Sequence, residues 1–390
     1  AVDIRTTGAG NDITIAVSST TNDALVLNSG GAITVNDTVT LTANSMDVDA
    51  VGNITDGGTG VLATAAGDLD LRSTTGTIGV DATNALNVSV AGGNLVLRTD
   101  AAAGAGDIFI TSAANLSVGA ITSGTGSDAV DIRTTGGATL TITNATETLT
   151  GDAVVLDSGT GTLTIADTAF DVAAGSLSLT GDEINLTGGD DSIRGNGGTI
   201  LLRPSTTSLD IRIGAAADSG APLDLIASDI TAIQNGFTSI TIGRSTDGTG
   251  AVSIDGTVTF SDPTAIHGGS IVDTGFVVGT SAGNDLTLHA RTGAIGTSVA
   301  DPLNVNVGGN LVLVTDAAAG AADIFVTSAA DLSVGSITTG AGTDAVDIRT
   351  TGAGNDITIA VSSTTNDALV LNSGGAITVN DTVTLTANSM

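Results

Sequence analysis

Residues 1–46 read AVDIRTTGAGNDITIAVSSTTNDALVLNSGGAITVNDTVTLTANSM, and the same stretch recurs without a change as residues 345–390. Near its start, VDIR (2–5) alternates apolar and charged residues. In an extended strand, Val2 and Ile4 would face one side, and Asp3 and Arg5 would face the other. A period of two with one apolar face predicts a half-buried β-strand. Gly, Asn, Asp and Thr follow each such segment and predict turns.

This rhythm continues along the chain with a spacing of roughly ten residues. Segments with the same pattern include residues 13–17, 24–28, 33–36, 39–43, 69–73, 95–99, 107–112 and 129–134. The sequence therefore predicts an all-β protein.

The repeats have two lengths. Residues 92–122 are echoed by residues 308–338 at an offset of 216, and the heptapeptide AVDIRTT starts at Ala1, Ala129 and Ala345. We expect the chain to be a window on a longer array. The predicted divisions are a solenoid unit 1–128, a longer unit 129–344 with an insertion near 181–280, and the start of the next 344-residue period at 345–390.

The repeats favour a parallel β-helix, or β-solenoid, over tandem sandwich domains. Unequal units do not divide into modules of about 100 residues, as immunoglobulin-like domains would. A solenoid gains or loses coils freely because each coil contacts only its neighbours. We expect one continuous rod with coils of roughly 20–30 residues, each rising about 4.8 Å.

The composition restricts the possible functions. The 390 residues carry a formal net charge of −31; all ten basic residues are Arg, and only Glu147 and Glu183 among the 41 acids are Glu. Such an acidic chain opposes binding to nucleic acid and anionic membranes. The absence of Cys excludes disulfides, and the absence of Tyr and Trp removes the usual stacking platforms for bases and sugars. No apolar run approaches the ~20 residues of a membrane-spanning helix, so we expect no membrane insertion in this segment.

Two stretches share a more specific pattern. TTGTIGVDATNALNVSVAGGNLVL (74–97) and RTGAIGTSVADPLNVNVGGNLVL (291–313) both contain T-G-x-I-G, then L-N-V, then G-G-N-L-V-L. This pattern resembles the repeats of filamentous-haemagglutinin-like exoproteins, which are large secreted β-helical proteins of Gram-negative bacteria. The resemblance implies a right-handed β-helix, an extracellular or cell-surface location, and roles in adhesion, biofilm or filament formation.

One segment is a candidate calcium site. GGDDSIRGNGG (188–198) partly resembles the calcium-binding nonapeptide repeat G-G-x-G-x-D-x-U-x. Asp190, Asp191 and Asn196 are the candidate ligands, because carboxylate and amide oxygens suit Ca²⁺. A true site stacks several copies and only one imperfect copy is present, so a tight Asp/Gly turn is the alternative.

Other polar residues are predicted to be structural. Arg72, Arg98 and Arg133 lie in strands beside Asp70, Asp100 and Asp131, which could suggest a polysaccharide lyase or hydrolase. A solvated outer face with local charge pairing explains them better, since Arg98 is replaced by Val314 in the echo. His267 and His289 show no metal-binding spacing, so we expect ordinary face or loop positions.

The predicted function is therefore structural. We expect a rod segment of an extracellular bacterial fibre or giant surface adhesin, with no enzymatic activity and no required cofactor. Calcium would bind ladders of outward carboxylates stacked about 4.8 Å apart. Partners would be further copies, end to end or laterally, and a host or neighbouring cell surface. The alternatives are a glycan- or protein-binding β-helix and, third, a polysaccharide lyase or hydrolase.

Two structural details complete the predictions. The insertion holds three of the four Pro residues, so the longest loops should fall there. Five residues lie in strands whose two sides both look apolar: Val96, Phe109, Val312, Val314 and Phe325. Some of them should face outward or lie at a coil corner, and matching patches on neighbouring rods should pack together.

Overall fold

The computed structural model is made almost entirely of parallel β-strands, as predicted. It describes residues 1–102, 105–124, 126–143, 149, 152–219, 222–317, 321–340, 344–365 and 367–390. The chain divides into two compact units. Unit 1 comprises residues 1–200 and 232–234, and unit 2 comprises residues 201–231 and 235–390.

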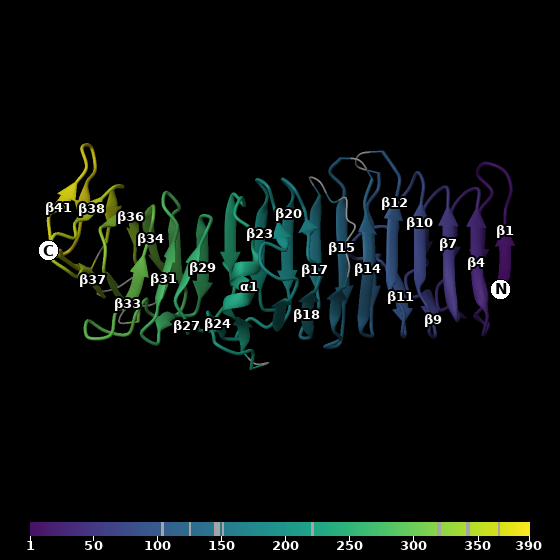
Figure 1. Cartoon of the computed structure of the whole chain (residues 1–390), viewed down its shortest axis with the longest axis horizontal. Helices are drawn as coiled ribbons and strands as arrows, with labels where there is room; N and C mark the ends of the chain where they lie inside the picture. Colours follow the sequence, from purple (N-terminus) through teal and green to yellow (C-terminus); the bar gives the residue numbers. More distant parts are fainter. Residues whose placement is uncertain are drawn as a thin grey trace. The chain divides into compact units, whose positions relative to one another are not determined.

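Unit 1 is a coil whose turns each add one strand to each of several sheets. The first sheet has the order β1 (Val2–Arg5), β4 (Ala24–Ser29), β7 (Ser45–Ala50), β10 (Leu69–Ser73), β12 (Leu95–Thr99), β14 (Leu116–Thr122), β16 (Leu140–Ile142), β18 (Thr162–Ile165) and β21 (Glu183–Leu186). The second has the order β3 (Ser19–Thr20), β6 (Thr40–Ala43), β9 (Val61–Thr64), β11 (Leu86–Val90), β13 (Ile108–Ser112), β15 (Ala129–Thr134), β17 (Ala153–Asp157) and β20 (Ser176–Thr180). Shorter ladders are formed by β2 (Ile13–Ile15), β5 (Ile33–Val35) and β8 (Ile54–Asp56), and by β19 (Phe170–Asp171) with β22 (Ile193–Arg194). Figure 1 shows β4, β7, β10, β12 and β14 side by side in that order.

Unit 2 repeats this arrangement. One sheet has the order β23 (Thr199–Arg203), whose first two residues belong to unit 1, then β26 (Ser239–Ile242), β29 (Thr264–Gly268), β32 (Leu286–Ala290), β34 (Asn310–Thr315), β36 (Leu332–Thr338), β38 (Ile357–Ile359) and β41 (Ile377–Val379). Another has the order β25 (Leu223–Leu225), β24 (Ile211–Ile213), β27 (Val252–Ile254) and β30 (Ile271–Asp273). The others are β28 (Val258–Phe260), β31 (Val277–Thr280), β33 (Leu303–Asn306), β35 (Ile324–Ser328), β37 (Ala345–Thr350) and β40 (Ala368–Asn372), and the pair β39 (Ser363–Thr364) and β42 (Leu385–Thr386). Each unit is thus a parallel β-solenoid, and the predicted fold class is confirmed.

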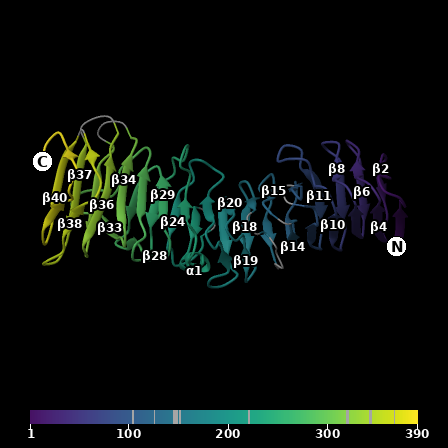
Figure 2. The same ribbon diagram turned by 90° about the horizontal axis from the view of Figure 1, so that it is seen from above.

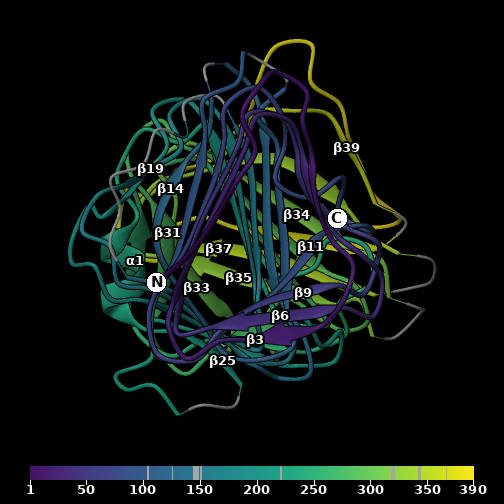
Figure 3. The same ribbon diagram turned by 90° about the vertical axis from the view of Figure 1, so that its right-hand side faces the viewer.

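The core of each coil consists of stacked aliphatic side chains. In β12, Leu95 and Leu97 are fully buried while Arg98 points outward. Leu97 lies in register with Leu71 on one neighbouring coil and Ile121 on the other, so identical positions form continuous ladders. Burial of each such side chain contributes about 1.5–3 kcal/mol. Figure 3 shows β3, β6 and β9 next to one another around one side of the coil.

A long excursion of the chain lies in the segment predicted to be an insertion. Paired positions on adjacent coils of unit 1 are mostly 20–30 residues apart, as with Leu71 and Leu97. In unit 2, Ile211 pairs with Val252 across 41 residues, and β25, α1 (Ala227–Ala232) and β26 lie between them. α1 is the single helix in the part of the chain that the structure describes, and no helix there is long and apolar enough to cross a membrane.

The five apolar residues, some of which were expected to face outward, divide into two groups. Phe325 is buried, with 8% of its surface exposed. Its backbone passes close to Gly296, where a Cβ atom would lie 2.3 Å from the Phe325 carbonyl oxygen. Val96, Phe109, Val312 and Val314 are half-buried on the outer faces of β12, β13 and β34, and lateral packing through them stays a prediction.

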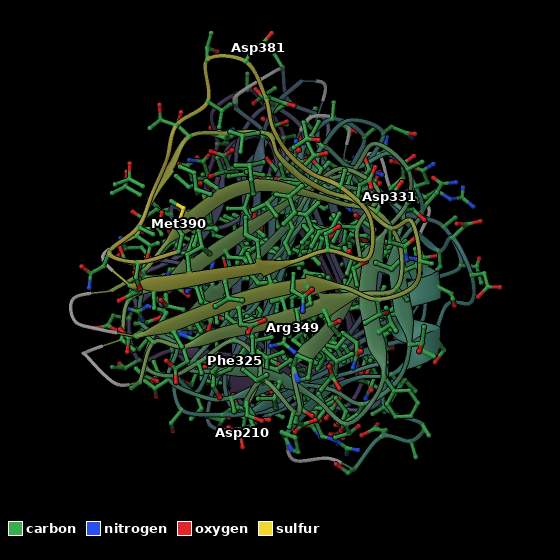
Figure 4. The ribbon with its side chains drawn as sticks, turned by 90° about the vertical axis from the view of Figure 1, so that its left-hand side faces the viewer. Asp210, Phe325, Asp331, Arg349, Asp381 and Met390 are labelled. Atoms are coloured by element: carbon green, nitrogen blue, oxygen red, sulfur yellow. The ribbon has the colours of Figure 1, made fainter. Side chains whose placement is uncertain are left out.

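The identical sequences 1–46 and 345–390 have different surroundings. β37 is paired on both sides, by β35 and β40, and Ile348 is fully buried. β1 carries the same residues but pairs only with β4, which leaves Ile4 43% exposed. β41 likewise lies at a sheet edge, with Ile377 exposed, although its counterpart Ile33 is buried. Figure 4 shows the projecting loop at Asp381 in unit 2, and Figure 2 shows β37 beside its partner β40.

Candidate functional site

The T-G-x-I-G motif forms a corner of the coil. Ile78 is fully buried and forms parallel bridges to Ile54 and Ile108. Gly79 has a φ of 80°, and a Cβ atom there would lie 2.3 Å from the carbonyl oxygen of Phe109, so only glycine fits. The second copy of the motif uses Ile295, Gly296, Ile271, Ile324 and Phe325 in the same way.

The two asparagines of the motif bind neighbouring coils. Asn87 donates its backbone N–H and its Nδ2 hydrogen to Asp56 Oδ2, at 2.8 and 2.9 Å. The backbone N–H of Asn94 donates to Asp68 Oδ1 at 2.7 Å, and Asn94 Oδ1 accepts from Ser117 Oγ. The corresponding sets in unit 2 are Asn304 with Asp273, and Asn310 with Asp285 and Ser333. The residues that carry the family resemblance therefore hold coils together.

A similar contact between coils is made repeatedly by aspartate side chains. Asp12 directly precedes β2, and its Oδ1 accepts the backbone N–H of Ala32, which directly precedes β5 on the next coil, at 2.7 Å. We name this contact the strand-start clamp. The short Asp side chain reaches the next coil and satisfies a backbone donor at the point where the ladder begins. The same contact is made by Asp68, Asp107, Asp210, Asp285, Asp323, Asp331 and Asp356, and by Asn53 and Asn115.

The outer face of the first sheet carries a charged row, defined as Asp47, Asp49, Asp70, Arg72 and Arg98. Asp47 lies in register with Asp70, Asp49 with Arg72, and Arg72 with Arg98. Burial, together with the neighbouring carboxylates of Asp47 and Asp49, raises the pKa of Asp70. Burial and Asp49 likewise raise the pKa of Asp47. The row therefore contains one pair of carboxylates in register on adjacent coils, Asp47 and Asp70, and the next coils on either side of this pair carry Val26 and Val96 at the same position.

The arginines of this face are paired, as predicted. Asp100 accepts hydrogen bonds from Arg72 Nη2 and from Arg98 Nε, both at 2.7 Å. On the second sheet, Arg133 in β15 donates two hydrogen bonds to Asp131, at 2.6 and 2.7 Å. Arg72 is thus bound to the carboxylate of the next coil and not to Asp70 in its own strand.

The insertion contains a further ionic cluster. Arg212 in β24 contacts Asp255 at 2.5 Å and Asp224 at 3.3 Å, and Asp224 is fully buried. Asp224 also accepts hydrogen bonds from the backbone N–H and the Oγ of Ser219. Through these contacts, Ser219 in the loop after β24 is bound to Asp224 in β25, and β24 is bound to its neighbouring strands. Sequence reasoning missed it because these residues are brought together only by the register of β24, β25 and β27.

The three calcium candidates lie at the two ends of β22. Asp190 and Asp191 are exposed in the turn before the strand, and Asn196 is exposed in the turn after it. Asp191 and Asn196 adopt positive φ angles of 56° and 38°, which is typical of tight Asp/Asn/Gly turns. The Asp191 carbonyl accepts a hydrogen bond from Arg194 Nε, as in a structural turn. Calcium binding by these residues stays a prediction.

The two histidines lie on adjacent coils of unit 2. His267 in β29 is in register with His289 in β32, and both are half-buried. Their separation of 22 residues corresponds to one coil, so no short sequence motif could have indicated the contact.

The fold and these contacts define a parallel β-solenoid repeat protein. No family model, no curated protein and no solved structure matches this chain.

Proposed function

We propose that this chain is a structural segment of an extracellular bacterial fibre or giant surface adhesin. The hydrogen bonds of the polar residues support a structural role. The motif asparagines and most strand-start aspartates bind the next coil of the same chain. A repeated exterior of this kind extends a solenoid without creating a unique cleft. The resemblance to filamentous-haemagglutinin-like exoproteins supports the extracellular location.

One observation carries the proposal. Ile348 is fully buried in β37, which has a strand on both sides, whereas the matching Ile4 is exposed in β1, which has a strand on one side only. Ile377 is likewise exposed in the edge strand β41, although its counterpart Ile33 is buried. Unpaired edges favour strand addition. We therefore propose end-to-end association, either between copies or along a longer chain, as the way the fibre grows.

The outer face is proposed to have no catalytic role. A lyase would need an arginine that gives up its proton, but hydrogen bonding to Asp100 raises the pKa of Arg72. Hydrogen bonding to Asp131 similarly raises the pKa of Arg133. Both guanidinium groups are therefore held in the protonated state, which suits charge pairing and opposes general-base catalysis.

Calcium is expected to stabilise the charged row. Asp47 and Asp70 face each other on adjacent coils, and Ca²⁺ would relieve their repulsion. We expect millimolar Ca²⁺ to raise the melting temperature by roughly 2–4 °C over chelator and to increase light scattering through association. Asp70→Asn should reduce this gain, whereas Asp23→Asn, in an exposed bend, should leave it unchanged. Melting and scattering curves that coincide in the two buffers would contradict the calcium proposal.

The pH dependence in chelator follows from the same row. The pKa of both Asp47 and Asp70 is raised in the folded state. Their contribution to stability is therefore fully present below the ordinary Asp pKa and is lost as the pH rises through the raised value. Mild acidification should thus partly replace calcium in the wild type, and less so in Asp70→Asn.

A further inference from the structure

The two histidines of this protein and Asp316 form a row of three side chains in contact. His267 Nδ1 lies 3.2 Å from His289 Nδ1, and the rings meet edge to face, with centroids 5.3 Å apart and planes inclined by 74°. On its other side, His289 Nε2 lies 2.6 Å from Oδ2 of Asp316, which directly follows β34 on the next coil. Three successive coils thus contribute one residue each.

The contact with Asp316 determines which nitrogen of His289 is available. An ionised carboxylate only accepts hydrogen bonds, so Nε2 of neutral His289 carries the proton. Its Nδ1 atom then presents a lone pair toward His267. This carboxylate–histidine pair is the arrangement that commonly orients a metal-bound imidazole and raises its basicity.

The surroundings of His267 favour its neutral form, which is the form of imidazole that binds a metal ion. Burial, and then the nearby His289 and Arg291, lower the pKa of His267 to about 4. The 3.2 Å separation of the two Nδ1 atoms leaves room for one proton at most between them, and a metal ion bound by both atoms would displace it.

The separation of the two nitrogens fits one metal ion. Zinc–nitrogen bonds are about 2.0–2.1 Å long, so two nitrogens 3.2 Å apart subtend roughly 100–105° at the metal, close to the tetrahedral angle. Two imidazoles favour Zn²⁺, Ni²⁺ or Cu²⁺ over Ca²⁺ or Mg²⁺, which prefer oxygen ligands. The positive charge of Arg291 opposes the metal and should keep the affinity moderate.

We propose that His267 and His289, with Asp316 as a positioning residue, form a two-histidine site for a divalent transition metal such as Zn²⁺ or Cu²⁺. The remaining coordination positions face outward from β29 and β32. Arg291 Nε is buried without a hydrogen-bond partner beside this site, so an anionic group on the metal would find a donor there. Because the site spans the outer face of three successive coils, it would add a metal-dependent attachment point to the solenoid.

The amino-acid composition simplifies a test of metal binding. The chain has two His and no Cys, so tag-free protein offers no other imidazole or thiolate ligand. We would titrate the complete chain with ZnCl₂ by calorimetry and with CuCl₂ by electron paramagnetic resonance. The expected results are one equivalent of Zn²⁺ and a Cu²⁺ signal with two coupled nitrogens. His267→Gln and His289→Gln should each weaken binding at least tenfold.

The controls separate a metal site from a folding effect. Asp316→Asn should weaken Zn²⁺ binding about 10–100-fold, as for other residues that orient a metal ligand. Asp381→Asn removes the same charge from an exposed turn and should leave binding unchanged. Circular dichroism would verify that each variant is folded, and imidazole ¹⁵N spectra of the wild type would show both Nδ1 signals shifting on Zn²⁺ addition. Wild-type binding with no nitrogen coupling, equal binding by the histidine variants, or no binding at 100 µM Zn²⁺ would each overturn the proposal.

Discussion

Lysine in place of Ile348 is expected to destabilise unit 2 by more than about 4 kcal/mol, because it places an unpaired charge in a dry aliphatic ladder. Ile348 is fully buried between Val326 and Leu371. The matched control is Ile4→Lys, which makes the same change in the same sequence. Ile4 is 43% exposed and has a neighbouring coil on one side only, so the loss should be roughly 1 kcal/mol or less.

Urea unfolding followed by circular dichroism would measure both variants. Ile4→Lys should also reduce the association seen in light scattering, since it places a charge on the edge proposed to receive another coil. Equal loss of stability in the two variants would contradict the claim that coil stacking determines the burial of these residues.

The second large effect is expected at Asp152, which is fully buried. Its carboxylate accepts the backbone N–H of Asp128 at 2.8 Å and the hydroxyl of Ser123. Asp152→Ala leaves both buried donors without an acceptor, which should cost about 2–5 kcal/mol. Asp152→Asn keeps one acceptor oxygen and should cost clearly less. Thermal and urea unfolding of the two variants would measure the difference, and equal losses would contradict the account.

Asp367 offers a matched test of the pH dependence. It is the counterpart of Asp152 in unit 2 and accepts the backbone N–H of Asp344 at 2.8 Å. Burial raises the pKa of Asp152. At Asp367 burial also acts to raise the pKa, but hydrogen bonds from Thr339, Asp344 and Thr365 outweigh it, and the pKa is lowered.

The two aspartates should therefore respond to pH in opposite directions. The contribution of Asp152 is present below the ordinary Asp pKa and is lost as the pH rises through its raised value. The contribution of Asp367 is present above the ordinary Asp pKa and is lost as the pH falls through its lowered value. Unfolding curves of Asp152→Asn and Asp367→Asn across the acidic range should differ from wild type with opposite slopes, and slopes of one sign would contradict the assignment.

The regular part of the fold could be predicted from local patterns. Alternation in LVLRT (95–99) fixes which side chains of β12 are buried, and the unusual composition of the insertion marks the long coil between β24 and β27. The single-residue strand at Ile78 could not be predicted, because one buried residue has no period. Which of the strand residues with two apolar sides face outward could not be predicted either: Phe325 is buried, whereas Phe109, at the equivalent position beside Gly79, is half-buried.

The contacts between coils could not be predicted from the sequence, and the reason is the same for all of them. Most of the strand-start clamps, the Asp47–Asp70 pair and the His267–His289 pair join residues about 20–26 positions apart, and the clamp between Asp210 and Ala251 spans 41. Which residues face each other depends on the length of every coil, and these lengths vary along the chain. Stacked carboxylates could be predicted in general terms, but the residues that pair could not be named.

The most direct test of the proposed fibre is negative-stain electron microscopy of the purified chain over a range of concentrations, with and without calcium. We expect filaments of constant width that become longer as the protein concentration rises. The Ile4→Lys variant should form fewer filaments than the wild type. Discrete particles of one size at every concentration, with wild type and Ile4→Lys alike, would contradict the proposed fibre.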